Sequence, residues 1–261
     1  MREIARKEVR TPLGRLSSWV RFAAGFLLVA VAAVPAFVAC ALMAPFRALR
    51  IRVGNLYGKI VGSTLARLAG TRTIIEHPER LDPARPAIYV TNHASVLDIF
   101  VGMWLCPYGG CGVAKKELRR VPVFGQIYWL TGHLLIDRTD RAGAIAALTR
   151  TAEVVRRHRL GIWMWPEGTR SRNGRLQPFK KGFAHLALAT GLPVVPVVLH
   201  QAHLLWPPRS LRLVPGDLKV QVLEAVDTSG WRLETLDQHI EHVRRLFLAV
   251  LGEDQRPLRR P

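Results

Sequence analysis

The feature that most constrains this chain is a run of 25 residues without a charged side chain, residues 22–46, which lies between Arg21 and Arg47. As one continuous helix this run would be about 37 Å long at about 1.5 Å per residue, longer than a hydrocarbon core of about 30 Å. A helix buried inside a soluble domain rarely needs that length. We therefore expect a membrane anchor, in which Pro35 should kink or break the helix at its middle.

The way this segment meets a membrane stays open between two arrangements. One is a single tilted span, and the other is a helical hairpin that bends near Pro35 and stays in one leaflet. Both flanks are basic, with six Lys/Arg against two Glu in residues 1–21 and four cations without an acid in residues 47–59. Two basic ends on one anionic face favour the hairpin or a surface-lying anchor. A cleaved signal peptide is a third possibility.

The charge of the whole chain points to an anionic partner. Lys and Arg number 38 against 19 Asp and Glu, which gives a formal net charge of +19. A chain so basic attracts nucleic acid, acidic lipid or a phosphorylated substrate. We expect no nucleic-acid partner, because the cations are scattered and no recognised nucleic-acid module is present. The three cysteines, Cys40, Cys106 and Cys111, form no C-x-x-C pair, which argues against a disulfide framework or a zinc site.

From residue 72 onward, short apolar runs alternate with helical patterns, which predicts an α/β domain with a mostly parallel central sheet flanked by helices. The expected strands are 72–76, 87–91, 111–114, 133–137, 161–165, 194–199 and 218–224. The expected helices are 51–69, read as a second interfacial helix, and 96–105, 140–158, 181–189 and 232–251. We divide the chain into a basic flank (1–21), hydrophobic membrane-associated helices (22–70), one α/β domain (71–252) and a flexible basic tail (253–261).

The loop after strand 87–91 carries the first candidate for chemistry, because ligands of such folds bind beyond the carboxyl ends of the strands. Its sequence is T-N-H-A-S-V-L-D, residues 91–98. Asp98 would lie in the first turns of a helix and could reach back to His93. A carboxylate on one ring nitrogen fixes the tautomer and leaves the other nitrogen free as a base. No G-x-S-x-G elbow occurs in the chain, and Ser95 is interpreted as a helix cap.

A second loop, W-P-E-G-T-R-S at residues 165–171, follows strand 161–165 and combines Glu167 with Arg170 on a turn. Arginine binds phosphate through two parallel hydrogen bonds, and lysine adds a point charge. The cations that follow closely are Arg172, Arg175, Lys180 and Lys181, and a further basic cluster is formed by Lys115, Lys116, Arg119 and Arg120.

Four blocks in order, N-H-A-S-V-L-D, G-H-L-L-I-D-R, P-E-G-T-R and V-P-V-V, resemble the 1-acyl-glycerol-3-phosphate acyltransferases, a family of glycerolipid acyltransferases, over roughly residues 72–200. The pattern departs from the family at Leu135, where an aromatic residue is usual. The resemblance implies an α/β acyltransferase domain in which His93 is the base and Asp98 its partner. It implies a substrate site drawn from Asn92, Ser95, Lys115, Arg138, Glu167, Gly168, Thr169 and Arg170.

The reaction implied by this resemblance moves an acyl chain from acyl-CoA or acyl-ACP (acyl carrier protein) to the free hydroxyl of 1-acyl-glycerol-3-phosphate, giving phosphatidic acid for phospholipid biosynthesis. We expect direct transfer without an acyl-enzyme, with no cofactor and no metal, and with backbone N–H groups near Ser95 and Val96 as oxyanion donors. The expected partners are membrane lipids, the lysophospholipid acceptor and the acyl donor. The expected location is the cell membrane, with the catalytic domain facing the cytoplasm.

The sequence leaves open the identity of the acceptor, the identity of the acyl donor and the type of reaction. The acceptor could instead be glycerol 3-phosphate, another lysophospholipid or a lyso-amino-acid lipid, and the choice between the two donors is open. A hydrolase that uses His93 and Asp98 to activate water, and a purely structural anchored protein, are the competing functions from other classes.

Overall fold

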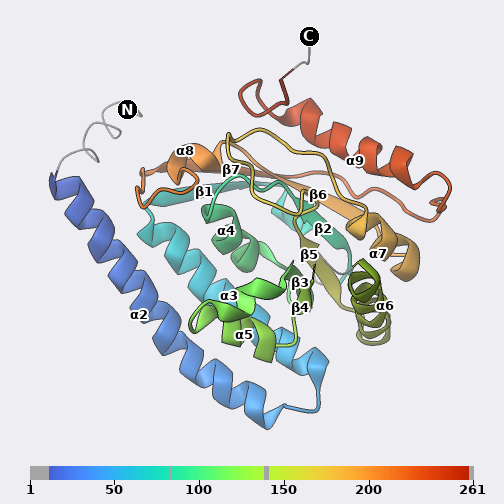
Figure 1. The fold of residues 1–261 in the computed structure, drawn as a ribbon, viewed down its shortest axis with the longest axis horizontal. Coiled ribbons are helices and arrows are strands. Elements are labelled where there is room, and N and C mark those ends of the chain that lie inside the picture. Colours follow the sequence, from blue (N-terminus) through green and yellow to red (C-terminus); the bar gives the residue numbers. More distant parts are fainter. Residues whose placement is uncertain (1–11, 83, 138–140, 259–261) are drawn as a thin grey trace.

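The structure, a computed structural model, describes residues 12–82, 84–137 and 141–258 of the chain. Its centre is a seven-stranded sheet with the strand order β1-β7-β6-β2-β5-β3-β4 (Figure 1). All neighbouring strands are parallel except β6 and β7. The strands are β1 (Thr71–Glu76), β2 (Ile88–Thr91), β3 (Gly110–Lys115), β4 (Leu134–Ile136), β5 (Gly161–Met164), β6 (Val194–Leu199) and β7 (Gly216–Val222). The predicted α/β fold is confirmed, and every expected strand lies within two residues of an observed one.

Helices cover both faces of the sheet (Figure 1). Those that confirm the sequence prediction are α4 (Leu97–Leu105), α6 (Arg141–His158), α7 (Gly182–Thr190) and α9 (Leu236–Val250). The elements that lie outside the predicted helices are α5 (Phe124–Leu130), α8 (Ala202–Leu205) and the 3-10 turns η1 (Pro78–Arg80) and η2 (Lys116–Arg120).

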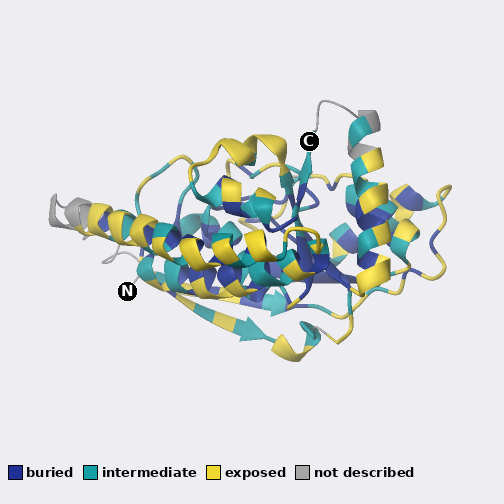
Figure 2. Cartoon of the chain, turned by 90° about the horizontal axis from the view of Figure 1, so that it is seen from below, coloured by how far each residue is buried: buried dark blue, intermediate teal, exposed yellow. Residues whose placement is uncertain are grey.

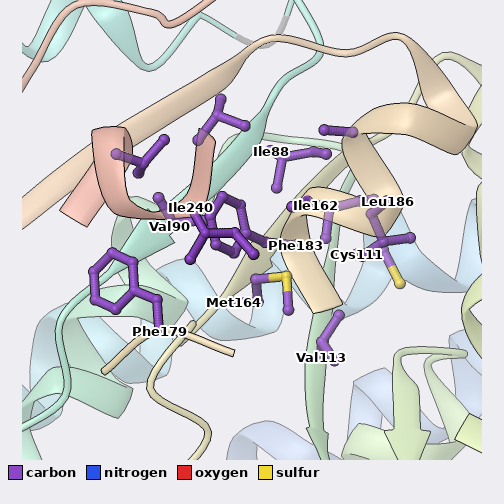
Figure 3. Packing of buried hydrophobic residues seen from close by; sticks show 14 of the residues in the cluster. Ile88, Val90, Cys111, Val113, Ile162, Met164, Phe179, Phe183, Leu186 and Ile240 are labelled. Carbon is purple, nitrogen blue, oxygen red and sulfur yellow. The ribbon is translucent and has the colours of Figure 1, made fainter. Parts of the chain in front are cut away.

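The central strands are buried on both faces, which is why they are apolar throughout rather than alternating. Ile88 and Val90 of β2 point to one face, where they pack with Phe183 of α7 (Figure 3). Tyr89 points to the opposite face, where its ring stacks on Trp163 of β5 with centroids 5.7 Å apart. Burial of each such side chain contributes about 1.5–3 kcal/mol. The loops that leave β2 and β5 therefore start from fully buried strands near the centre of the sheet.

The apolar run forms one helix, α2 (Pro12–Leu42), and the chain turns back at residues 43–46 into α3 (Arg47–Leu68). The prediction that the helix breaks at Pro35 and that a hairpin turns there is wrong, because α2 continues through Pro35 and the turn lies at residues 43–46. Pro35 lies on the exposed side of α2, while Ala33 and Ala36 on either side of it are buried in a cluster with Val61 of α3. Proline removes only one backbone hydrogen bond. Packing against α3 on both sides of the proline keeps the helix continuous.

Helix α3, which the sequence predicts as an interfacial helix, also packs on the domain through α4. Its glycines permit the close approach: a Cβ atom at Gly62 would lie 2.4 Å from the carbonyl oxygen of Phe100, and one at Gly58 would lie 3.1 Å from that of Met103. The three glycines that weaken the helical pattern of this segment are thus explained in part by helix packing.

One helical stretch in the described part of the chain, Ser17–Leu42, is long and apolar enough to cross a membrane, although buried core helices and signal sequences share those properties. Only 22% of its most apolar window is buried inside the protein. Exposed residues run along α2 (Figure 2), and the large apolar ones are Trp19, Val20, Phe26, Leu27, Val31, Val34, Val38 and Leu42.

Candidate active site

Three loops meet at the carboxyl end of the central strands. Strand β2 pairs in parallel with both β5 and β6, so the residues that follow these three strands emerge at one edge. The loop after β2 carries His93, the loop after β5 carries Glu167 and Arg170, and β6 ends at Leu199. The topology therefore brings together the first, third and fourth blocks of the sequence pattern.

The His93 side chain is held by a buried carboxylate. His93 Nδ1 lies 3.0 Å from Asp98 Oδ2, and the Asp98 side chain is 1% exposed. The same oxygen accepts hydrogen bonds from the backbone N–H groups of Ala94 and Ser95, both at 2.6 Å. Asp98 thus fixes the loop and the ring together, as the spacing of the two residues predicts. The Ser95 N–H donates to Asp98, so the expectation that it serves an oxyanion is wrong.

The His93 backbone is held by a second buried carboxylate, Glu167. Glu167 Oε1 accepts from the His93 N–H at 2.6 Å, and Oε2 accepts from the Gln177 N–H at 2.8 Å. The Ser171 N–H in turn donates to the His93 carbonyl oxygen at 2.7 Å. Burial raises the pKa of Glu167 to about 8, while the two N–H donors act in the opposite direction by favouring the charged form.

Three residues expected at the substrate site lie behind it and bond the chain itself. Asn92, 4% exposed, exchanges hydrogen bonds with the backbone of Leu199 through its side-chain oxygen and nitrogen. Ser95 Oγ donates to the Trp206 carbonyl and accepts from the Leu97 N–H, which fits its interpretation as a helix cap. Glu167, the third, is 2% exposed. Their geometry gives them a structural task beside His93.

A cavity of about 740 Å³ opens next to His93. The lining includes His93 and four of the expected substrate-site residues, which are Lys115, Gly168, Thr169 and Arg170. Arg170 lines the cavity, and its buried Nε has no hydrogen-bond partner among the described residues. Most of the remaining wall is apolar and comes from α2, α3, α4 and α5, including Phe26, Val29, Phe100, Met103 and Ile127.

Two features of the loop after β5 shape this wall. Gly168 has φ +71°, a left-handed conformation that favours glycine, and its N–H closes a turn on the Trp165 carbonyl at 3.0 Å. The Trp165 ring lies 5.2 Å from the His93 ring, centroid to centroid, and lines the cavity. Neither Trp165 nor Gln177 is among the site residues predicted from the sequence. An indole beside P-E-G could have suggested the former, but Gln177 contributes a backbone N–H, which leaves no side-chain signal.

The described part of the second block, residues 132–137, includes β4, which is separated from β2 by β5 and β3 in the sheet. His133 lines the cavity and accepts from the Gly112 N–H through Nδ1 at 3.1 Å. Burial lowers the pKa of His133 to about 4, so this ring is neutral at physiological pH. Asp137 forms an ion pair with Lys116. Arg138, the expected phosphate ligand of this block, lies outside the described residues.

The described ranges contain no group of three His, Cys, Asp or Glu side chains that could hold a metal ion. A half-buried histidine is paired with a buried aspartate beside a mainly apolar cavity that Arg170 also lines, on a mostly parallel sheet, and this arrangement fits the class of glycerolipid-type acyltransferases. A family model described as Acyltransferase matches residues 72–200.

Named relatives make the family more specific. The chain is 42% identical to a "1-acyl-sn-glycerol-3-phosphate acyltransferase" of Cocos nucifera, over 92% of this chain and 78% of that protein. It is 34% identical to a protein of the same name from Salmonella typhimurium, over 77% and 79%. The chain belongs to the 1-acyl-sn-glycerol-3-phosphate acyltransferase family and is an acyltransferase of that type, which confirms the resemblance found in the sequence.

A solved structure agrees with this assignment. The 1-acyl-sn-glycerophosphate acyltransferase from Thermotoga maritima superposes with a TM-score of 0.63 at 25% identity, covering 88% of this chain and 97% of that one.

Proposed function

We propose that this enzyme transfers an acyl chain from acyl-CoA or acyl-ACP to the free hydroxyl of 1-acyl-glycerol-3-phosphate, producing phosphatidic acid. The observation that carries the proposal is the His93–Asp98 pair at 3.0 Å, which stands at one cavity with Arg170 and a long apolar wall. The names of the relatives support this acceptor.

His93 is the general base of the proposed reaction. With Nδ1 bonded to Asp98, Nε2 is the nitrogen left to take the proton from the acceptor hydroxyl. The hydroxyl oxygen attacks the thioester carbonyl, a C–O bond forms, the C–S bond breaks, and the proton passes from His93 to the departing thiolate. A positioned base of this kind contributes about 10²–10⁴-fold. Because a thioester is already activated, no acyl-enzyme, metal or cofactor enters the scheme.

Arg170 binds the acceptor phosphate in this proposal, with Thr169 and the Gly168 backbone shaping the same wall. The unpartnered Nε and the position at the cavity support that role. The apolar part of the cavity holds the acyl chain. Lys115, exposed at the mouth, adds positive charge for a polyanionic donor, and Arg138 is proposed for the acceptor on the family resemblance alone.

The enzyme is proposed to work on the cell membrane, with the catalytic domain on the cytoplasmic side. The exposed apolar face of α2 and the basic residues around it support attachment to an anionic lipid surface. Binding to vesicles of phosphatidylglycerol and phosphatidylethanolamine should weaken with salt and keep a salt-resistant remainder, which flotation at increasing NaCl measures.

The function is tested by thiol release from acyl-CoA or acyl-ACP in the presence and absence of lysophosphatidic acid, with product analysis by thin-layer chromatography. His93→Ala should lower kcat by at least about 10²-fold, whereas the matched change at an exposed histidine of α9, His242→Ala, should not. Arg170→Ala should raise the acceptor KM, with exposed Arg172→Ala as its control. An active His93→Ala enzyme would refute the mechanism. Thiol release that needs no acceptor would favour the hydrolase.

A further inference from the structure

The chain beyond α9 returns to the back of the active site through one buried residue, Gln255. This glutamine is 1% exposed, although its neighbours Asp254 and Arg256 are exposed. All four of its polar groups are engaged: the N–H donates to Gly252, and the carbonyl and both side-chain atoms bond other parts of the chain. This burial and bonding differ from the flexible tail that the sequence predicts for residues 253–261, and they indicate that Gln255 has a structural role.

The Gln255 side chain reaches the residue that anchors Asn92. Its Oε1 accepts from the Gln201 N–H at 2.8 Å, and its Nε2 donates to the Leu199 carbonyl at 3.4 Å. The same carbonyl accepts from Asn92 Nδ2 at 2.9 Å, and the Leu199 N–H returns a bond to Asn92 Oδ1 at 2.8 Å. Asn92 directly precedes His93. The Leu199 carbonyl oxygen therefore links the loop that carries His93 to the C-terminal segment, because it accepts from both Asn92 and Gln255.

The Gln255 backbone bonds the loop that follows β5. The Leu176 N–H donates to the Gln255 carbonyl at 2.8 Å. The next residue, Gln177, donates its N–H to Glu167, whose other oxygen accepts from the His93 N–H. Two independent chains of hydrogen bonds thus lead from this one residue to the two sides of His93.

Arg175 fastens the same contact from outside. Its Nη1 donates to the carbonyl oxygens of Glu253 and Arg256, the two residues that enclose the stretch around Gln255. Arg175 belongs to the loop that carries Arg170. The C-terminal segment is consequently fixed to the phosphate-side loop by side-chain as well as backbone bonds.

We propose that Gln255 is a positioning residue for the reaction: it clamps the β6 end and the loop after Glu167 together and so holds His93 in register with Asp98. This inference rests on the proposed function. Gln255 is not among the residues that line the cavity. Its loss should therefore lower kcat and leave the acceptor KM nearly unchanged, because small misplacements of a catalytic group reduce rate rather than ground-state binding.

The test compares two replacements at this position with one control. Gln255→Met keeps the length and removes both side-chain hydrogen bonds, and we expect kcat per folded enzyme to fall about 10–100-fold with KM for lysophosphatidic acid within about threefold. Asp254→Ala removes only an exposed bond to the Gln201 side chain and should stay within about twofold of the wild type in kcat. Folded fractions come from circular dichroism in detergent at the assay temperature.

Gln255→Glu supplies a readout that a merely structural role would not move. A protonated carboxyl still offers an acceptor to Gln201 and an O–H donor to Leu199, whereas the ionised form faces the Leu199 carbonyl without a donor. The kcat of this variant, relative to wild type and per folded enzyme, should rise as the pH falls. This variant also decides the matter if Gln255→Met does not fold.

A turnover-free measurement separates this proposal from the proposed function. Carbethoxylation of His93 by diethyl pyrocarbonate, followed by mass spectrometry, should change in rate at least threefold in Gln255→Met and not in Asp254→Ala. A wild-type enzyme that transfers no acyl chain while these rates differ would overturn only the proposed function. A wild-type level of kcat per folded Gln255→Met, or a pH-independent loss in Gln255→Glu, would overturn the positioning role.

Discussion

Replacing Glu167 by Gln changes one buried oxygen into an NH₂ group. The change tests whether the hydrogen bonds of Glu167 hold the loop that carries the catalytic histidine. Glu167 uses one carboxyl oxygen for the His93 N–H and the other for the Gln177 N–H, at 2.6 and 2.8 Å. An amide has a single acceptor oxygen, so one of these two N–H groups must face the NH₂ group. Both bonds lie in an interior where Glu167 is 2% exposed, and water cannot easily replace the lost acceptor.

The expected cost follows from this geometry. A buried donor left without an acceptor costs about 1–3 kcal/mol in the free energy of unfolding. For a domain of this size each kcal/mol lowers Tm by about 2–4 °C, so Glu167→Gln should melt roughly 2–12 °C below the wild type. If the orphaned donor is that of His93, the loop moves, and kcat should fall by up to about 10²-fold.

The assay is thermal unfolding by circular dichroism in detergent, together with kcat for transfer to lysophosphatidic acid below both melting temperatures. The matched control is Glu153→Gln, the same chemical change at an exposed position of α6, which should alter neither quantity. An unchanged Tm and kcat in Glu167→Gln would show that Glu167 does not brace His93.

Two further predictions concern pH and packing. Burial raises the pKa of Glu167 from 4.5 to about 8, so the folded protein holds this proton more tightly than the unfolded chain does. The resulting contribution to the free energy of unfolding is complete below about pH 4.5 and is lost as the pH rises to about 8, by at most about 1.4 kcal/mol per pH unit. Urea titrations at several pH values should show this decline in stability, and Glu167→Gln should make the decline smaller. Gly62→Ala would put a Cβ atom 2.4 Å from the Phe100 carbonyl oxygen and should lower the free energy of unfolding in urea by about 1–3 kcal/mol. The control, Gly230→Ala, should be neutral because a Cβ atom there would have no atom within 4 Å. Equal stability of the two variants would contradict the close packing of α3 on α4.

The sheet could be predicted from sequence because its signal is local. Strands β2, β5 and β6 are short apolar runs bounded by turn residues, and every residue in them is buried. Helix α5 has no such signal: Pro122 and Gly125 interrupt the apolar pattern. Gly125 is required by tertiary packing, since a Cβ atom there would lie 2.0 Å from the Leu118 carbonyl oxygen. The prediction at Pro35 failed for a related reason, because packing against α3 outweighs the local preference of proline.

The candidate site divides in the same way. The His93–Asp98 contact could be predicted, since two side chains five residues apart at a helix start can meet without help from the rest of the fold. The hydrogen bonds that hold the backbone around His93 could not be predicted, because Gln177 and Ser171 act through backbone N–H groups, which almost any residue supplies. Gln255 carries no sequence signal either, and only the path of the chain after α9 brings it beneath the catalytic loops.

The two buried carboxylates at His93 have separate tasks, and their different surroundings explain how both can be accommodated. Asp98 bonds the ring and two backbone N–H groups through one oxygen, whereas Glu167 bonds only the backbone. Burial raises the pKa of Glu167, which favours its neutral form and so reduces the negative charge beside the imidazole. The two carboxylates therefore hold different parts of the same residue: Asp98 bonds the imidazole ring of His93, and Glu167 bonds its backbone N–H, so the orientation of the ring and the position of the loop depend on different side chains.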